Sequence, residues 1–355
     1  MRAQVPMLAR QCGEHHGIPP SPCWRKMLES DARRHATAGS SRRRWLTTAL
    51  KVAIVLIMLW FIRGRIVEWW QQLGQHRFRV DYGWLAVSGV LYLLGSLMSG
   101  LFWHRTLRTL GQEVSLGHAL KAYYIGHLGK YVPGKAMVVV LRAGLIRGPG
   151  VEASLAVISV FFETLTMMAV GACLAAAIVA GYVRENERWF WASVLMMLSA
   201  GLPTLPPVAK RLARILTAGR LTPTARVKLD QLGGRTVVLG WALNLLGWAL
   251  LGLSVWAVLR ALGTGNPNPL AELQFCTAAI ALATVAGFLS FVPGGAVVRE
   301  AVLAETIALL MPYIGGTPAL VASVLLRLVW LLSELVISGI LYLLGGKITA
   351  GNPES

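Results

Sequence analysis

Gly126-His-Leu-Gly-Lys-Tyr-Val-Pro-Gly-Lys135 interrupts an apolar part of this chain, and a similar stretch, Gly287-Phe-Leu-Ser-Phe-Val-Pro-Gly-Gly295, interrupts another. Proline removes a backbone donor and glycine relaxes the dihedral limits, so each stretch is expected to break a hydrophobic helix. In a bilayer, a broken helix is tolerated only where its freed backbone groups face protein or water. Paired breaks in the two halves of a chain are typical of a transport site.

The composition around these breaks is that of a membrane protein. Of 355 residues, 55% are hydrophobic and 14% are charged, whereas about a quarter of the residues in a soluble domain are charged. The mean hydropathy is +0.58. The net charge of +18 does not indicate nucleic-acid binding, because the basic residues cluster in short connections between apolar spans. Such connections attract anionic lipid headgroups.

The hydropathy pattern predicts an all-α polytopic membrane protein, a helical bundle of about 7–9 membrane segments. The two Pro-Gly-broken stretches, 119–146 and 296–312, are expected to be re-entrant or amphipathic segments in an internal repeat. The remaining predicted spans are 46–62, 83–103, 152–181, 189–207, 236–259, 271–291 and 317–344.

The flanking segments predict the orientation. Residues 1–45 contain nine Lys/Arg and three Asp/Glu and are expected to form a disordered basic cytoplasmic tail, with no signal peptide. Seven Lys/Arg lie in each of the segments 104–151 and 208–235, so these are expected inside, with a cytoplasmic N-terminus in the inner (plasma) membrane. The transmembrane domain is predicted over 46–345, followed by a polar tail, 346–355.

Whether the repeat is parallel or inverted stays open at this point. With the spans above, four crossings separate the two breaks, and the halves are parallel copies that both break from the cytoplasmic side. If one broken segment crosses the membrane fully, the halves become inverted copies instead.

A helix that restarts after a Pro-Gly break points free N–H groups and a positive dipole end at the break, which favours an anion. Arginine suits a phosphate headgroup because its planar fork binds two oxygens at once. Lys130, taken alone, is best explained as a topology signal. The predicted substrate-binding residues are Pro133, Gly134, Lys135, Arg142, Pro293, Gly294, Gly295, Arg299 and Glu300.

Three further charges lie deep within predicted spans, where a charge is costly unless it faces the bundle interior. Arg327 and Glu334 are separated by seven residues, about two helical turns, which is too far for direct contact. Glu163 is therefore the expected partner of Arg327. The three form a predicted intramembrane charge network, either a structural ion pair or a proton- or headgroup-contacting site.

Other chemistry is not indicated. Cys173 and Cys276 lie in apolar spans and are expected to be small core residues. His104, His118 and His127 lack metal-ligand spacing and are expected at the interface. No nucleotide-binding, haem or zinc motif occurs, which argues against an ATP-driven pump. We therefore expect no metal, no cofactor and no enzymatic activity.

These features together resemble a known family. A Tyr/Gly segment with a Pro-Gly break and a downstream Arg occurs at 123–142, and Phe162-Glu163 lies in the following span. Pro293-Gly-Gly-Ala-Val-Val-Arg-Glu300 and an Arg-containing last span come later. The chain is similar, over about 46–345, to the membrane-domain family named after lysylphosphatidylglycerol synthase, also described as flippase-like. The chain continues only ten residues beyond the last span, so the resemblance implies lipid translocation or recognition without the soluble synthase domain.

The leading hypothesis is a lipid translocase that binds a membrane phospholipid or lipid-linked substrate with an anionic or amphoteric headgroup. A second is a non-catalytic accessory subunit of a partner transferase. A third is an intramembrane transferase with Glu163, Glu300 or Glu334 as general base, although no carboxylate pair has clear catalytic spacing.

Overall fold

The computed structural model describes residues 80–131, 137–182, 187–216, 222–290, 295 and 297–345. Every regular element in these ranges is helical. In chain order the elements are α2 (Tyr82–Thr109), α3 (Leu116–His127), the 3-10 turn η1 (Leu128–Tyr131), α4 (Met137–Leu145), α5 (Ala153–Tyr182), α6 (Glu187–Gly201), η2 (Leu202–Thr204), α7 (Pro206–Leu216), α8 (Pro223–Asp230), α9 (Gly234–Ala261), α10 (Pro269–Leu289), α11 (Val298–Leu310) and α12 (Gly316–Gly345).

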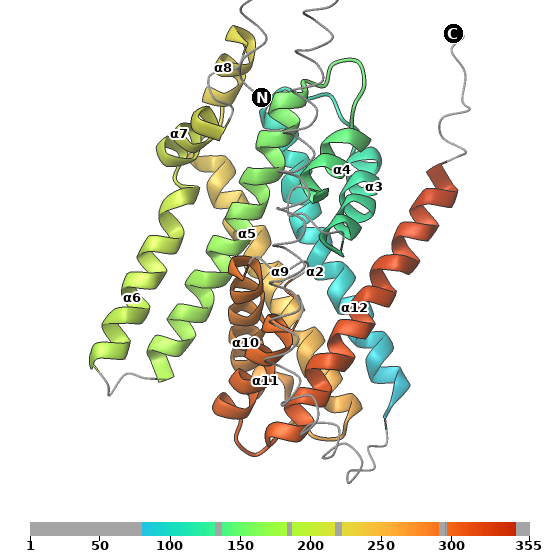
Figure 1. The fold of residues 1–355 in the computed structure, drawn as a ribbon, viewed down its shortest axis with the longest axis vertical. Helices are drawn as coiled ribbons and strands as arrows, with labels where there is room; N and C mark the ends of the chain where they lie inside the picture. The colour runs from blue at the N-terminus through green and yellow to red at the C-terminus, as the bar shows by residue number, and fades with distance from the viewer. Residues whose placement is uncertain are drawn as a thin grey trace, which may run out of the picture. The chain divides into compact units, whose positions relative to one another are not determined.

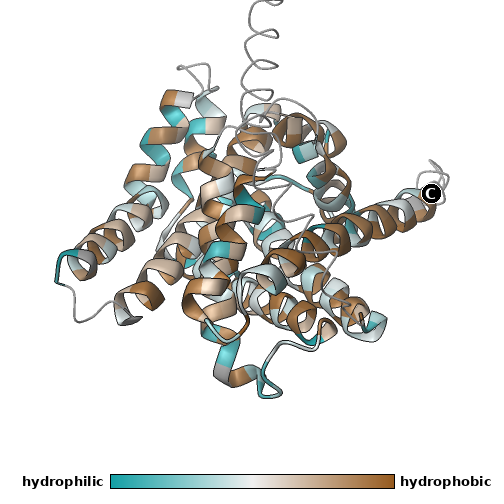
Figure 2. Cartoon of the chain, turned by 60° about the horizontal axis from the view of Figure 1, so that its bottom comes forward, coloured by the Kyte–Doolittle hydropathy of each residue, from teal (hydrophilic) through white to brown (hydrophobic). Residues whose placement is uncertain are grey.

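Within the described ranges, five helices are long and apolar enough to cross a membrane: α2, α5, α9, α10 and α12. The bent pair of α6 and α7, which meet at 65°, makes a sixth if it is counted as one span. Figure 2 shows the apolar residues spread along these helices. The predicted count of seven to nine segments is not confirmed in these ranges, and the predicted tail 1–45, the predicted span 46–62 and the predicted tail 346–355 lie outside the described residues.

Helices α2 and α9 pack closely along much of their length in opposite directions. The N–H of Asp81, just before α2, donates to the carbonyl of Ala261 at the end of α9 over 2.9 Å. At the middle of the pair, a Cβ placed on Gly95 would lie 3.0 Å from the carbonyl oxygen of Gly247, and the reverse distance is 3.1 Å. The absence of side chains at these two glycines lets the backbones touch.

The two broken segments form helix–break–helix hairpins, and they enter the bundle from opposite ends. In Figure 1, α3 and α4 lie in its upper half, whereas α10 and α11 lie in its lower half. Three elements, α5, the bent α6–α7 pair and α9, run between the hairpins. The predicted span 271–291 corresponds to α10, which follows these three elements, leads into the second break and packs on α11.

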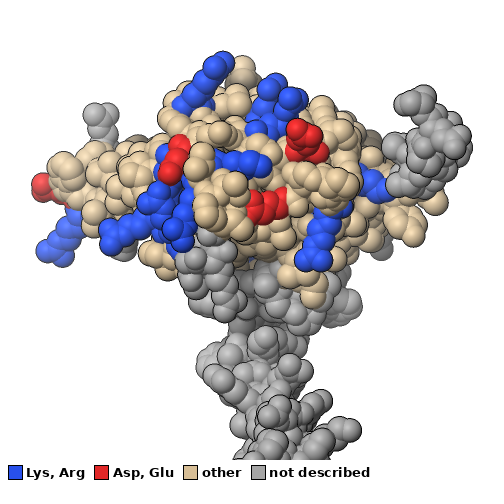
Figure 3. All heavy atoms as spheres, turned by 90° about the horizontal axis from the view of Figure 1, so that it is seen from above, with Lys and Arg blue, Asp and Glu red and all other residues tan. Residues whose placement is uncertain are grey.

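The upper end of the bundle carries the basic connections. The turns from α2 to α3 and from α4 to α5, together with α7 and α8, lie at this end (Figure 1). Figure 3 shows Lys and Arg side chains distributed over this end of the molecule, with fewer acidic ones. At the lower end, the segment 262–268 and the turn 311–315 contain no Lys, Arg, Asp or Glu. The charge asymmetry of the loops is therefore also an asymmetry between the two ends of the bundle.

Candidate functional site

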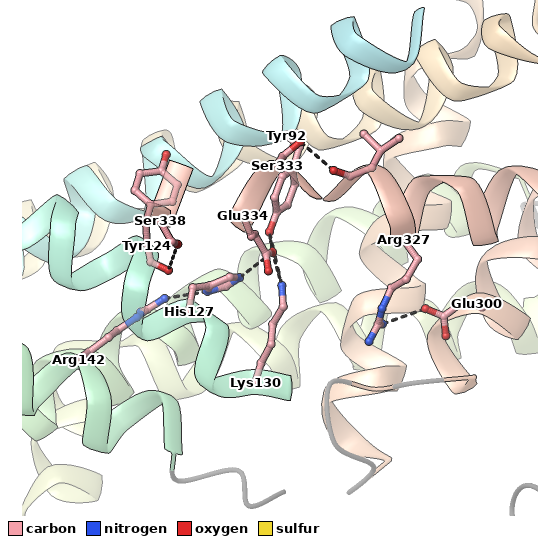
Figure 4. A network of polar contacts seen from close by, with 11 residues as sticks. Tyr92, Tyr124, His127, Lys130, Arg142, Glu300, Arg327, Ser333, Glu334 and Ser338 are labelled. Atoms are coloured by element: carbon pink, nitrogen blue, oxygen red, sulfur yellow. Dashed lines mark hydrogen bonds and ion pairs between the residues drawn. The ribbon is translucent and has the colours of Figure 1, made fainter. Parts of the chain in front are cut away.

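Helix α2, the C-terminal end of α3 and the turn η1 each bring one side chain against Glu334 of α12 (Figure 4). Glu334 is 1% exposed, and its Oε1 accepts hydrogen bonds from Lys130 Nζ and Tyr92 Oη. His127 Nε2 lies 3.7 Å from the same oxygen. The explanation of Lys130 as a topology signal is thus incomplete, because its ammonium points into the bundle and binds the buried carboxylate of Glu334.

A second charge pair lies beside this group. Arg142 of α4 donates to Glu163 of α5 over 2.7 Å, and both side chains are 2% exposed. Arg142 also approaches His127 Nδ1 at 3.0 Å, and its guanidinium lies 3.9 Å from the ring centroid of Tyr123. The predicted pairing of Glu163 with Arg327 is wrong, because the return of the chain at the first break places α4 between α3 and α5.

Arg327 instead pairs with the second hairpin. Its Nη1 donates to Glu300 Oε1 over 2.9 Å, and the two side chains are 19% and 15% exposed. The other oxygen of Glu300 accepts from the N–H of Val297 over 2.5 Å at the start of α11. The guanidinium of Arg327 also lies 5.5 Å from the ring centroid of Tyr131 in the first hairpin. Arg327 of α12 therefore lies between residues that flank the two breaks.

The backbone around the second break is tight. Gly295 has φ of 63° and Val297 has φ of 67°, a conformation that a β-branched residue rarely adopts. A Cβ on Gly287 would lie 3.3 Å from the Cα of Gly295. This close return of the chain starts α11 beside the end of α10, and it places Arg299 and Glu300 in the first turn of α11.

Arg299 packs against aromatic side chains. Its guanidinium lies 4.4 Å from the ring centroid of Trp330, and Trp330 stacks on Tyr92 with centroids 4.2 Å apart. Among the residues described, no carboxylate oxygen lies within 4.0 Å of the Arg299 guanidinium. The adjacent residues Arg299 and Glu300 thus point in different directions, as expected from their positions on a helix.

The assembled cluster has an excess of positive charge. It contains the cations Lys130, Arg142, Arg299 and Arg327 and the carboxylates Glu163, Glu300 and Glu334. Lys130 lies in η1, outside the five candidate spans. Burial, opposed by Glu334 and aided by Arg299 and Arg327, lowers the pKa of the Lys130 ammonium to about 8. An anion that enters this cluster would meet both hairpins at once.

Two buried polar atoms in the cluster have no hydrogen-bond partner in the described part of the chain: Glu334 Oε2 and Arg142 Nε. Buried polar atoms without partners are uncommon in native structures. The carboxylate of Glu334 therefore has one oxygen that a donor group could still reach.

Only some of the predicted site residues lie in the described ranges. Pro133, Gly134, Lys135, Pro293 and Gly294 lie outside the described residues. Arg142, Glu163, Arg299, Glu300, Arg327 and Glu334 are described and make the contacts of the cluster. Gly295 is also described and lies against Gly287 at the second break. His127 and Lys130 were not among the predicted site residues. His127 was expected at the interface, whereas it lies near Glu334 and Arg142. The one signal in the sequence that could have indicated these contacts is its position four residues before Tyr131, next to the first break.

No group of three His, Cys, Asp or Glu able to hold a metal ion occurs in the described ranges. Cys173 and Cys276 are buried and free. The cluster is therefore built from cations, carboxylates and aromatic rings, a set that suits an anionic or amphoteric ligand.

Comparison with known sequences agrees with the fold. No curated protein matches the chain. The sequence model of the family described as "Lysylphosphatidylglycerol synthase TM region" matches residues 48–337, which include α2 to α11, most of α12 and every residue of the cluster. The match and the apolar helices together make this a multi-pass membrane protein. The chain belongs to the family of the lysylphosphatidylglycerol synthase transmembrane region.

Proposed function

We propose that this protein is a lipid translocase that binds a phosphate-bearing headgroup, anionic or amphoteric, at the cluster between its two hairpins. The observation that carries the proposal is the position of Arg327 of α12 between the flanks of the two breaks: its guanidinium lies 5.5 Å from the Tyr131 ring centroid, and its Nη1 donates to Glu300. Cations from both hairpins and from α12 converge there, inside a bundle whose outer surface is apolar. Such a site would hold a headgroup while the acyl chains stay in the bilayer.

We infer that the two halves of the chain form an inverted internal repeat, which would support this mechanism. Helices α2 and α9 each have 28 residues, and α5 and α12 each have 30. A shift of 152 residues carries Tyr82–Thr109 onto Gly234–Ala261. Under this shift, buried positions of α2 fall on buried positions of α9: Gly95 on Gly247, Ser99 on Leu251 and Phe102 on Ser254.

The repeat units would then be α2–α5 and α9–α12, each with one hairpin between two long helices. The glycines Gly95 and Gly247, which touch each other, become equivalent positions, so an approximate two-fold axis would pass between them. In transporters with inverted repeats, rocking of one unit against the other exposes a central site to each side of the membrane in turn. The glycine contact is a natural pivot for this motion.

The basic end of the bundle would face the cytoplasm in the plasma membrane, as the positive-inside rule requires. Arg226, exposed at this end, would also contact the anionic lipid surface. The headgroup would reach the cluster from one leaflet past the first hairpin and from the other leaflet past the second.

The test is leaflet exchange of fluorescent phosphatidylglycerol and of an aminoacylated analogue in liposomes that contain the purified full chain. Arg299→Gln removes a cation that has no carboxylate partner among the described residues, so the fold is expected to persist. A lost charge-assisted hydrogen bond of about 1.5–3 kcal/mol corresponds to exchange slower by about tenfold to a hundredfold. Arg211→Gln, the same substitution at the exposed basic end, is the matched control and should leave the rate unchanged.

Two results would contradict the proposal. If Arg299→Gln exchanges lipid as fast as the wild type, the cluster does not bind the headgroup. If the folded wild type exchanges no lipid, the protein does not translocate by itself, and the accessory-subunit hypothesis takes its place.

A further inference from the structure

We propose that Glu300 is an internal counter-anion, which occupies the position of the headgroup phosphate until the lipid displaces it. This inference rests on the proposed translocase function and assigns Glu300 a role opposite to that of a substrate-binding residue. The ligand chemistry is a phosphate oxyanion, carried by a lipid headgroup or by free phosphate.

The first argument is the set of donors that Glu300 holds. One carboxylate oxygen accepts from the Val297 N–H over 2.5 Å, and the other accepts from Arg327 Nη1 over 2.9 Å. A free backbone N–H at the start of a helix and an arginine fork are the donors that bind phosphate in proteins. The carboxylate therefore sits where two oxygens of a phosphate would be placed.

The second argument is the surplus of binding groups around this position. Arg299 precedes Glu300 in the same helical turn and lies against Trp330, with no carboxylate within 4.0 Å among the residues described. The buried Glu334 Oε2 has no hydrogen-bond partner in the part of the chain that the structure describes. A phosphate at Arg327 could also bind Arg299, and a hydroxyl or N–H of the headgroup could donate to Glu334.

The third argument is a comparison of the three carboxylates. Glu163 and Glu334 are each 1% exposed, and each is held by an inward-facing cation. Glu300 is 15% exposed and Arg327 is 19% exposed, so this pair retains some contact with its surroundings. Separating a fully buried ion pair leaves an uncompensated charge, whereas a less deeply buried pair can exchange partners at lower cost. Glu300 is thus the carboxylate that an incoming anion displaces from its arginine.

The exchange conserves charge in the cluster. While Glu300 neutralises Arg327, the empty site can close without a buried uncompensated cation. When the phosphate arrives, Glu300 moves away and the phosphate takes its place. The counter-anion would therefore weaken lipid binding. It would also assist the conformational change by which the empty protein returns to its starting state.

Glu300→Gln tests this inference. Glutamine keeps the size of the side chain and an oxygen that can still accept from the Val297 N–H, as in a capping box. It removes only the negative charge. Calorimetric titration of the detergent-purified full chain would use dihexanoyl phosphatidylglycerol, glycerol 3-phosphate and inorganic phosphate as separate probes. Glu305→Gln, at an exposed position of the same helix, is the matched control.

We expect Glu300→Gln to bind the phosphate-bearing probe about tenfold more tightly than the wild type, because a like charge near the anion is lost. Lipid exchange by the same variant should become slower, since the empty site has lost its counter-anion. Glu305→Gln should change neither quantity. Opposite changes in affinity and exchange are the signature of a displaced counter-anion, because a merely structural role would weaken both.

The probes separate the two sources of phosphate. Tighter binding of dihexanoyl phosphatidylglycerol alone would assign the site to a lipid headgroup, and equal tightening for all three probes would assign it to phosphate in general. Unchanged or weaker binding by a folded Glu300→Gln, with binding by the wild type, would overturn the counter-anion and leave the translocase standing. Absence of binding and of exchange in both proteins would overturn the proposed function, and this inference with it.

Discussion

Two Arg–Glu pairs in this protein have the same chemistry and different surroundings. Arg142–Glu163, beside the first hairpin, has an N–O distance of 2.7 Å and both side chains are 2% exposed. Arg327–Glu300, at the second hairpin, has a distance of 2.9 Å with exposures of 19% and 15%. Arg142 is further enclosed by Tyr123 and His127. The difference shows that an ion pair's role depends on what surrounds it: the first pair is suited to hold helices together, and the second is suited to exchange partners.

The largest effect should come from removing Arg142. Arg142→Ala leaves Glu163 buried without a partner, which costs about 3–5 kcal/mol. Arg327→Ala should cost less than Arg142→Ala, because the Arg327–Glu300 pair is less deeply buried, with side chains 19% and 15% exposed. The free energy of unfolding, measured by denaturant titration in micelles, compares the two. Equal losses for both variants would remove the distinction between the pairs.

A smaller effect is expected from the close contact that positions Arg142. A Cβ on Gly126 would lie 3.1 Å from the backbone nitrogen of Arg142. Gly126→Ala should therefore destabilise the protein by about 1–3 kcal/mol through overpacking. Gly144→Ala is the control, since a Cβ there meets nothing within 4 Å, and it should stabilise α4 by up to about 1 kcal/mol. If both variants behave alike in thermal unfolding, the packing of α3 on α4 is looser than described.

The smallest effect concerns pH at Lys130, which lies between the two pairs. With a pKa of about 8, Lys130 is charged below this pH and loses its proton as the pH rises through it. Deprotonation removes one positive charge from the cluster, so lipid exchange should fall severalfold between about pH 7 and pH 9. Lys130→Arg, which stays charged, should abolish this decline, and Lys210→Arg should not. A decline that persists in Lys130→Arg would assign it to another group.

The sequence predicts the helices well because each is a local property. The predicted spans 83–103, 152–181, 236–259 and 317–344 lie within or close to α2, α5, α9 and α12. A run of about 20 apolar residues is recognisable without knowledge of its neighbours. The family follows from the same residues, since Pro293–Glu300 and the following Arg-containing span are read directly from the chain, and the family match agrees.

The partners of the buried charges could not be predicted in this way. Spacing along α12 correctly separates Arg327 from Glu334, but it does not show which helix faces each of them. Glu163 was assigned to Arg327, whereas it binds Arg142. Likewise, nothing in the sequence around Lys130 distinguishes it from a lysine in a cytoplasmic loop. Only the tertiary structure shows that its side chain binds Glu334 of α12.

By itself, the sequence determined that this is a multi-pass helical membrane protein with two Pro-Gly breaks and basic connections at one end. Hydropathy and backbone chemistry are properties of each segment, so they are visible before folding. Only the tertiary structure decided that the hairpins enter from opposite ends and that Tyr131, Arg327 and Glu300 lie together. These contacts join residues far apart in the chain, and their formation depends on how the helices pack against one another.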